Sequence, residues 1–456
     1  MTISQELARF IVDTEYEDLP SQVVAAAKRF LIDTLGLAIG GATTSQGRAI
    51  QAFLGETGGA PEATVVGTRL RASRLGAALG NGTLMRALEL EDTLEEAFFH
   101  SAPGAIGSTL ALLERHPCSG RELLAAVAVA YEVGVRIARA VSPSHANRGY
   151  HPTATIGSFG ACAASARLLG LDEARTVHAL GIAGLQAAGI MQSSHPSWRY
   201  LTAINGGRAA HLGVTAALMA GSGFPGADDI FEGPLGFCAM HSDAADLAVI
   251  TDGLGSDYVM PIVGIKLFPS SRPTHSPIAG ALELRERHGI DPQAIDGVQV
   301  KTFAEALASA DKPAPTSELD GQGSIQYLVA VALARGRYAL DDVNMDTVGD
   351  PAVRRVLDRV TLQGDAQLDA HRARRPSTWP AVVEVRVGGQ VHTARVDSPP
   401  GSAENPPTAR QMWDKYLSTS TRVIPYAQAE ELWQTVDRLE REDDLARFIR
   451  LWEAPA

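Results

Sequence analysis

Three segments of the sequence are rich in alanine and glycine, with apolar residues on every face if each segment is a helix. A helix that is apolar all round must be buried, so these segments belong inside the protein. Their small side chains let helix axes approach closely. The pattern therefore predicts a tight bundle whose central helices are covered by others. The three segments are residues 155–170, 178–191 and 206–223.

Two further segments carry clear helix start and stop signals. Pro20 and Ser21 open a segment whose apolar residues recur at helical spacing and stop at Gly40-Gly41. Ser119 precedes a long apolar run, and Glu122 follows three residues later as a capping-box partner. Residues 1–262 are therefore predicted to form an all-helical domain.

The pattern changes near residue 261. Residues 298–303 alternate as a strand does, and residues 381–399 indicate two strands around Gly388-Gly389. The stretches SIQYLVAVALARG and PAVRRVLDRV between them indicate helices. Residues 263–402 are thus predicted as a mixed α+β domain, and residues 403–456 as helices that pack back on the first domain. The fold class is mainly α with an α+β second domain.

Cysteine use and charge exclude several classes of protein. Cys118, Cys162 and Cys238 are scattered without a C-x-x-C pair, which argues against zinc ribbons, disulfide scaffolds and iron–sulfur clusters. The net charge of −12 argues against a nucleic-acid partner. The chain has no G-x-x-x-x-G-K-[ST] and no strand-borne G-x-G-x-x-G, so no nucleotide cofactor is indicated.

No segment has the character of a membrane span or an export signal. The longest apolar stretch, residues 123–131, is about half of the roughly 18 residues that suggest a span. The start, MTISQELARF, lacks a basic region followed by an apolar run. We therefore expect a cytoplasmic protein with no membrane partner.

The first group of candidate site residues lies in residues 81–104. Glu89, Asp92 and Glu96 stand at i, i+3 and i+7, which predicts three carboxylates on one helix face if the helix persists that far. His100 follows Phe98-Phe99 where an apolar segment meets a turn, and partial burial there tunes a histidine pKa. The alternative is a solvated acidic face with His100 as a loop residue, and for the acids alone this alternative is favoured.

A second candidate is His151, directly before Pro152 at the start of a helix of small residues. A helix N-terminus attracts anions through its free N–H groups, and a histidine there can work beside a bound carboxylate. The alternative, that His151 only caps the helix, has comparable weight.

The third group is the segment 264–279, with Lys266, Arg272 and His275 within ten residues. The prolines indicate an irregular loop. Cations on a loop at a domain junction indicate a surface that binds an anion and lines a ligand cleft. The alternative is a solvated basic loop, which the apolar neighbours make less favourable. Ser324 and Tyr327, before a buried helix, form a weaker candidate because such a tyrosine is usually a packing residue.

In order along the chain, several motifs resemble those of the MmgE/PrpD family over nearly the full length. They are NGTLMRALELEDT followed by His100, GYHPTATIGSFGACAASARLLGLD, GGRAAHLG, KLFPSSRPTH and SIQYLVAVAL. The family includes 2-methylcitrate dehydratase, cis-aconitate decarboxylase and iminodisuccinate epimerase. The resemblance implies a helical domain, an α+β lid domain, a homodimer and a site without metal.

The resemblance also implies functional residues at matching positions. It implies catalytic roles for His151, His100, Lys266, Tyr327 and Thr93. It implies substrate-binding roles for Glu89, Asp92, Arg272, His275, Ser324 and Arg199. Two positions depart from the family pattern: Glu89 stands for the first aspartate of D-F-D-D-T, and Thr202 stands where the family has a lysine, with Arg199 the nearest cation.

The resulting hypothesis is a cofactor-independent lyase, either a dehydratase or a decarboxylase, or an epimerase. It would act next to a carboxylate of a small di- or tricarboxylic acid by histidine acid/base catalysis. A second hypothesis keeps the fold but assigns a less charged or amine-bearing substrate in specialised metabolism, because a lost lysine removes a charge for a carboxylate. A third is a non-catalytic binding protein.

Overall fold

The computed structural model describes residues 1–57, 59–194 and 200–455, and the chain divides into two compact units. One unit, here called the helical unit, comprises Met1–Gly264 and Ala409–Ala456. The other, here called the α+β unit, comprises Ile265–Thr408. No helix within the described ranges combines the length and apolarity that crossing a bilayer requires.

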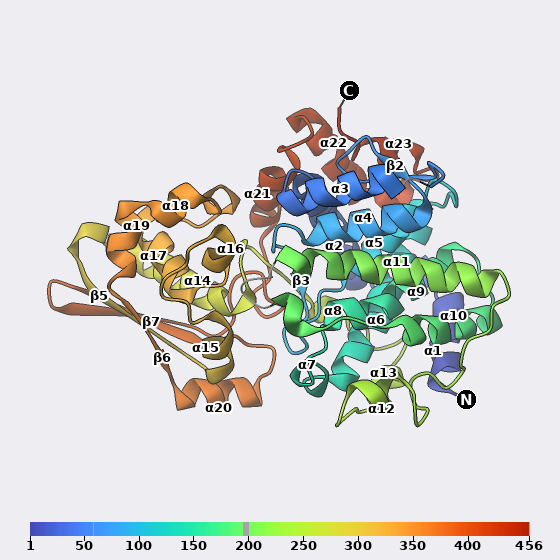
Figure 1. Cartoon of the computed structure of the whole chain (residues 1–456), viewed down its shortest axis with the longest axis horizontal. Coiled ribbons are helices and arrows are strands. Elements are labelled where there is room, and N and C mark those ends of the chain that lie inside the picture. The colour runs from blue at the N-terminus through green and yellow to red at the C-terminus, as the bar shows by residue number, and fades with distance from the viewer. Residues whose placement is uncertain (58, 195–199, 456) are drawn as a thin grey trace. The chain divides into compact units, whose positions relative to one another are not determined.

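The helical unit is built mainly from α-helices (Figure 1). Its helices are α1 (Ile3–Asp13), α2 (Ser21–Gly41), α3 (Ser45–Thr57), α4 (Arg74–Arg86), α5 (Ala102–Leu112), α6 (Gly120–Val141), α7 (Ser144–Asn147), α8 (Pro152–Thr155), α9 (Gly157–Leu168), α10 (Glu173–Gln186), α11 (Thr202–Gly221), α12 (Phe237–His241), α13 (Ala248–Thr251), α21 (Ala409–Ser420), α22 (Tyr426–Asp437) and α23 (Ala446–Arg450). The unit is not strictly all-helical, because β1 (Ala63–Thr64) pairs antiparallel with β2 (Arg71–Ala72), and β3 (Asp92–Thr93) is a further short strand.

The predicted ends of two long helices are confirmed. Helix α2 begins at Ser21 after Pro20 and ends at Gly41. Helix α6 begins at Gly120, and the Ser119 hydroxyl accepts a hydrogen bond from the Glu122 backbone while the Glu122 carboxylate accepts one from the Ser119 backbone. These local signals suffice because they satisfy backbone groups that the helix itself leaves unpaired.

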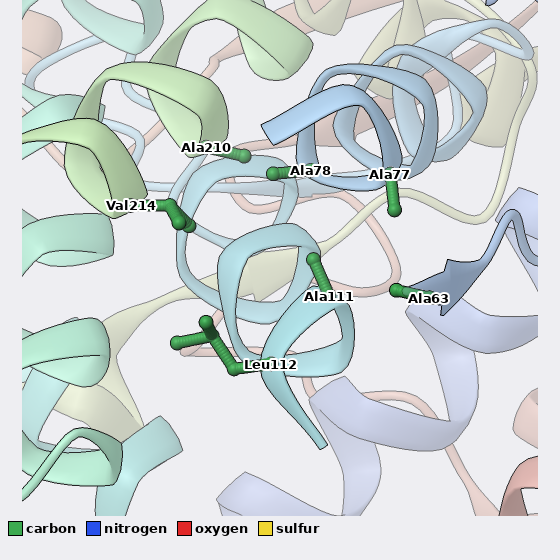
Figure 2. Packing of buried hydrophobic residues seen from close by; sticks show 7 residues of the cluster. All are labelled: Ala63, Ala77, Ala78, Ala111, Leu112, Ala210 and Val214. Atoms are coloured by element: carbon green, nitrogen blue, oxygen red, sulfur yellow. The ribbon is translucent and has the colours of Figure 1, made fainter. Parts of the chain in front are cut away.

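Small side chains allow close packing at the centre of the helical unit. Every residue of α5 is buried, as its all-round apolar character requires. Figure 2 shows side chains from α4, α5, α11 and β1 meeting in one cluster, and all of them are fully buried. They are Ala63, Ala77, Ala78, Ala111, Leu112, Ala210 and Val214. The prediction of buried central helices is thus confirmed for most of α9 and α11. It is wrong for the end of the segment 178–191, where α10 stops at Gln186 and Leu185 and Ile190 are 84% and 62% exposed.

Gly207 on α11 provides a test of this packing. A Cβ atom at Gly207 would stand 2.2 Å from both the Leu79 carbonyl oxygen and the Thr83 hydroxyl of α4. We therefore expect Gly207→Ala to lower the free energy of unfolding by about 1–3 kcal/mol, measured by urea denaturation. The control is Gly55→Ala on α3, where nothing lies within 4 Å, and this change should stabilise the protein by up to about 1 kcal/mol. Equal stability of the two variants would contradict the packing.

The C-terminal helices belong to the helical unit, and α21 and α22 pack on α2 (Figure 1, red and blue). Lys415 of α21 forms a buried ion pair with Asp33 of α2, with 2.6 Å between Nζ and Oδ1. Lys415 Nζ also donates to the Leu90 carbonyl at 2.8 Å. The tail of the chain therefore fixes the backbone beside residues 89–93.

The α+β unit contains a four-stranded sheet with helices packed on it (Figure 1). Its elements are α14 (His275–His288), β5 (Ile295–Thr302), α15 (Ala304–Ala310), α16 (Glu318–Gln322), α17 (Ile325–Arg335), α18 (Met345–Gly349), α19 (Pro351–Leu357), β6 (Val360–Gly364), α20 (Ala366–Arg374), β7 (Ala381–Val387) and β8 (Gln390–Val396), while β4 (Gly264–Ile265) lies at the unit boundary. The strand order is β6-β5-β7-β8, with β5 parallel to β6 and the other neighbours antiparallel.

Two of the predicted strand regions are confirmed and one strand is new. Strand β5 covers residues 298–302, and β7 and β8 form a hairpin in which Gly388 and Gly389 both have positive φ, 56° and 81°. The prediction that PAVRRVLDRV is wholly helical is wrong, because α19 ends at Leu357 and β6 begins at Val360. Pairing with Val298–Thr302, distant in sequence, determines this edge strand.

Candidate functional site

The segment from residue 87 to residue 101 does not continue the preceding helix. Helix α4 ends at Arg86, and Glu89 has the left-handed φ of 53°, which costs a residue with a Cβ atom about 1–2 kcal/mol. The prediction that Glu89, Asp92 and Glu96 share a helix face is therefore wrong. Glu89 and Asp92 are buried, whereas Glu96 lies at the surface, 2.7 Å from Arg139.

Asp92 holds the start of the next helix. Its carboxylate accepts hydrogen bonds from the backbone N–H groups of Ser101 and Ala102 at 3.1 Å and from the Tyr131 hydroxyl at 3.0 Å. Burial raises the pKa of this carboxyl to about 7, although the hydrogen bonds from Ala102 and Tyr131 act in the opposite direction. Asp92 thus positions α5 and the residues before it.

The ring of His100 is oriented by the same segment. Nδ1 lies 2.5 Å from the Asp92 carbonyl oxygen and 3.5 Å from Glu91 Oε1. A carbonyl only accepts, so Nδ1 carries the hydrogen, and in the neutral ring Nε2 holds the lone pair. The His100 backbone N–H donates to the Thr153 hydroxyl at 3.2 Å, and the residue is 9% exposed. The turn expected after His100 is instead the first turn of α5.

Sequence reasoning missed Arg86 and Glu91. Arg86 Nη1 lies 3.3 Å from Glu91 Oε1 and donates to the Thr153 hydroxyl at 3.4 Å. Both side chains are buried, 4% and 0% exposed. Glu91 stands inside the motif ELEDT, where the apolar residue Leu90 before it is a weak sequence signal that this acid is not on the surface.

His151 is the N-cap residue of α8, but its side chain makes no capping hydrogen bond. The alternative that the His151 side chain only caps the helix is therefore wrong. The residue is 4% exposed, and Nδ1 has no hydrogen-bond partner in the part of the chain that the structure describes. Burial, then the charges of Arg86 and His100, lower the pKa of His151 well below its usual value, while Glu89 raises it. The ring is therefore neutral at neutral pH.

The buried residues described so far, together with three threonines, are here called the His100 cluster. Its members are Arg86, Glu89, Glu91, Asp92, Thr93, His100, His151, Thr153 and Thr202. Thr93 is buried on β3 next to Asp92. Thr202 is the first residue of α11, and its hydroxyl donates to Glu89 Oε1 at 3.1 Å. The two positions that depart from the expected pattern thus contact each other. Arg199 lies outside the described residues.

The segment after β4 carries the cationic and histidine residues predicted for the site in the α+β unit. Lys266, Arg272 and His275 are 1%, 4% and 0% exposed, so the alternative of a solvated basic loop is wrong. The segment is also less irregular than expected, because residues 272–274 form a 3-10 turn and His275 begins α14. The Arg272 guanidinium donates to His275 Nδ1 at 3.0 Å, and His275 Nε2 then donates to the Ser270 carbonyl at 3.3 Å. His275 therefore orients Arg272.

Ser324 and Tyr327 lie beside this segment, since the Ser271 N–H donates to the Gln322 carbonyl. Ser324 caps α17: its hydroxyl accepts from the Tyr327 backbone at 3.0 Å and donates to the Lys312 carbonyl at 2.6 Å. Burial raises the pKa of Tyr327 to about 12, so its phenol stays protonated and can donate. Within the described ranges no three side chains of His, Cys, Asp or Glu are grouped to hold a metal ion.

The predicted site residues thus fall into two sets, five in the His100 cluster and five in the α+β unit. Comparison with known families matches the MmgE/PrpD N-terminal domain to residues 5–250 and the MmgE/PrpD C-terminal domain to residues 268–441. The chain belongs to the MmgE/PrpD family. The resemblance seen in the sequence motifs is confirmed.

Curated MmgE/PrpD relatives match most of the chain at low identity. A cis-aconitate decarboxylase-like protein of Aspergillus oryzae is 25% identical, covering 98% of this chain and 97% of its own. Human cis-aconitate decarboxylase is 24% identical, and the match covers 100% of this chain and 95% of the human protein. The 2-methylcitrate dehydratase of Cupriavidus necator is 25% identical, and the match covers 78% of this chain and 77% of the dehydratase. These relatives are enzymes, and the protein is an enzyme of MmgE/PrpD type.

Proposed function

We propose that the protein is a lyase or an epimerase that acts next to a carboxylate of a small di- or tricarboxylic acid, by histidine acid/base catalysis and without a cofactor. The relatives support the reaction class, because their names denote loss of carbon dioxide from cis-aconitate and loss of water from 2-methylcitrate. A reaction through an enolate-like species needs a base, a group that stabilises negative charge and a cation for the carboxylate.

The observation that carries the proposal is the orientation of His100. Its Nδ1–H is held by the Asp92 carbonyl, so Nε2 is the atom that accepts a substrate proton. Once Nε2 is protonated the ring is cationic, and the Glu91 carboxylate at 3.5 Å stabilises that charge. His100 is therefore assigned as the general base.

His151 is assigned a different role because its ring is neutral. A neutral imidazole donates a hydrogen bond to a developing enolate oxygen without the strong acidity of an imidazolium, and it can return a proton at the end of the reaction. Lys266 and Arg272 are assigned to the substrate carboxylate, since charge-assisted hydrogen bonds are strongest where water is excluded. Tyr327 and Thr93 are assigned as hydrogen-bond donors to substrate oxygens.

The proposal is tested by turnover of cis-aconitate, 2-methylcitrate and matched dicarboxylic acids, followed by NMR of the products. We expect His151→Ala and Lys266→Ala to lower kcat/KM about 100-fold or more. Lys301→Ala, which removes a sheet-surface cation paired with Glu384, serves as the control and should keep wild-type turnover. Wild-type turnover in both site variants would overturn these roles.

The homodimer implied by the family is part of the proposal. It is supported by large apolar side chains exposed close together in sequence, at the end of α10 and the start of α11: Leu185, Ile190, Tyr200, Leu201 and Ile204. We expect light scattering to give about twice the chain mass of 48.1 kDa, and Leu185→Glu with Ile190→Glu to shift the protein to monomer. A monomeric wild-type protein would contradict this part of the proposal.

A further inference from the structure

His145 is a fully buried histidine that the proposed mechanism does not use. It lies on the short helix α7, and 0% of the residue is exposed. Its ring stacks on the Tyr150 ring, with 5.2 Å between the centroids, and its centroid lies 5.7 Å from that of the His241 ring. A buried polar ring costs free energy unless its nitrogens are hydrogen-bonded. The partners of the two nitrogens therefore indicate which parts of the chain this ring connects.

Both ring nitrogens of His145 have partners. Nδ1 lies 3.3 Å from the His241 carbonyl oxygen, and Nε2 lies 2.8 Å from the Thr155 hydroxyl. A carbonyl only accepts, so Nδ1 carries the hydrogen, and Nε2 of the neutral ring accepts from the Thr155 hydroxyl. Burial, followed by the charge of the His241 ring, lowers the pKa of His145 to about 4, so the ring is neutral at neutral pH.

Thr155 connects the His145 ring to His151. It is the last residue of α8, the single helical turn that begins directly after His151. The Thr155 backbone N–H donates to the His151 carbonyl at 3.2 Å. The hydrogen bond from the Thr155 hydroxyl to His145 therefore holds the end of the same helical turn that His151 begins.

The position of the His151 ring depends on the backbone of this turn. Within the described residues, Nδ1 of the ring has no hydrogen-bond partner that would fix it. The backbone of His151, in contrast, is held on both sides. Its N–H donates to the Gly189 carbonyl at 3.1 Å, and its carbonyl accepts from the N–H groups of Ala154 and Thr155 at 3.0 and 3.2 Å. A shift of α8 would therefore move the His151 ring.

We propose that His145 is a positioning residue for His151 and acts through the Thr155 hydroxyl. This inference rests on the proposed function, in which His151 donates a hydrogen bond to a developing enolate oxygen. It extends that function to a residue outside the His100 cluster. Loss of the bond between His145 and Thr155 displaces the donor, which lowers the rate of the chemical step and leaves substrate binding nearly unchanged.

Two substitutions at residue 145 separate the two nitrogens. In His145→Gln the amide oxygen can accept from Thr155 as Nε2 does, whereas in His145→Asn the shorter amide can reach only the His241 carbonyl, as Nδ1 does. Thr155→Val removes the hydroxyl and keeps the branched shape, and Thr155→Ser keeps the hydroxyl. The control is His178→Asn, the same change at a histidine of α10 whose Nδ1 lies 3.1 Å from the Gly226 carbonyl oxygen. Thermal melts confirm that each variant is folded.

Steady-state kinetics are measured on the carboxylic acid panel, which comprises cis-aconitate, 2-methylcitrate and the matched dicarboxylic acids. We expect His145→Asn and Thr155→Val to lower kcat about tenfold or more, with KM within about twofold of wild type. His145→Gln, Thr155→Ser and His178→Asn should keep kcat within about threefold of wild type. In the His151→Ala background, His145→Asn should cause no further loss, because it acts through His151.

Three outcomes would overturn the inference. The first is a wild-type kcat in folded His145→Asn. The second is an equal loss in His145→Gln and His145→Asn, which would indicate that the ring is needed only for packing. The third is a further loss of about tenfold when His145→Asn is added to His151→Ala, which would indicate that His145 does not act through His151.

NMR of the full-length protein, isotope-labelled at its histidine rings, separates this inference from the proposed function. The His151 signal is identified by its absence from His151→Ala. We expect this signal to shift in His145→Asn and to stay in place in His145→Gln, although both variants lose the same ring. If wild type turns over no acid of the panel, the proposed function is overturned and this shift alone decides the role of His145. Turnover in wild type with an unchanged His151 signal in His145→Asn would keep the proposed function and overturn the inference.

Discussion

Glu91→Gln is expected to lower kcat roughly 100-fold while KM changes by no more than about twofold. The variant keeps the size of the side chain but removes the charge 3.5 Å from His100 Nδ1. The Glu91 charge acts favourably on the His100 ring only after Nε2 has taken a proton, so for His100 its loss affects the transition state and not substrate binding. Steady-state kinetics on the fastest acid of the panel measures both constants.

The controls separate this effect from loss of structure. His100→Gln should lower kcat by about 10²–10⁴, and the double variant should be no slower than His100→Gln, because Glu91 acts through His100. Glu96→Gln, which changes a partly exposed acid of the same segment that pairs with Arg139, should leave both constants unchanged. A wild-type kcat in folded Glu91→Gln, or a double variant much slower than His100→Gln, would show that Glu91 does not act through His100.

Lys415→Met is expected to lower the free energy of unfolding by about 3–5 kcal/mol. The Lys415 and Asp33 side chains are 5% and 2% exposed, so removing the cation leaves a buried carboxylate without its partner. The Leu90 carbonyl also loses a hydrogen bond at 2.8 Å. Urea denaturation at constant pH measures the loss.

The matched control lies on the same helix. Arg410 pairs with Asp414, and both are exposed, so Arg410→Met should cost no more than about 1 kcal/mol. The double variant Asp33→Leu with Lys415→Met should recover part of the loss, since it removes the unpaired charge. Comparable losses for Lys415→Met and Arg410→Met would contradict the buried pair.

The loss in Lys415→Met should also depend on pH. Burial already raises the pKa of Asp33, and removing Lys415 raises it further. A carboxyl whose pKa is higher in the folded than in the unfolded protein destabilises the fold as pH rises above the unfolded value, near 3.9, toward the folded value. The variant should therefore lose less stability at pH 5 than at pH 8, and the opposite trend would contradict this assignment.

The fold could be predicted from sequence wherever local signals decide the structure. The bounds of α2, the capping box of α6 and the glycine pair of the β7–β8 hairpin each satisfy backbone requirements within a few residues. The edge strand β6 could not be predicted, because its partner β5 lies far away in the sequence.

The residues of the candidate site could be predicted from the sequence, but their arrangement in space could not. The motifs singled out His100, His151 and Lys266, all of which are buried. The path of the chain around them depends on contacts across the fold: Lys415 holds the Leu90 carbonyl from 325 residues away. With that contact, and with Glu89 in a left-handed conformation, the chain is no longer helical after Arg86. The helical spacing of Glu89, Asp92 and Glu96 therefore does not place them on one face. The same change of path buries Glu91 beside His100.

The central claim, that His100 removes a proton next to a carboxylate, is tested most directly by deuterium exchange. The full-length protein is incubated in deuterated water with the carboxylic acid panel, and NMR follows label uptake at the carbon next to each carboxylate. We expect uptake into at least one acid, and a rate about 100-fold or more lower in folded His100→Gln. Uptake at the wild-type rate in His100→Gln would contradict the claim.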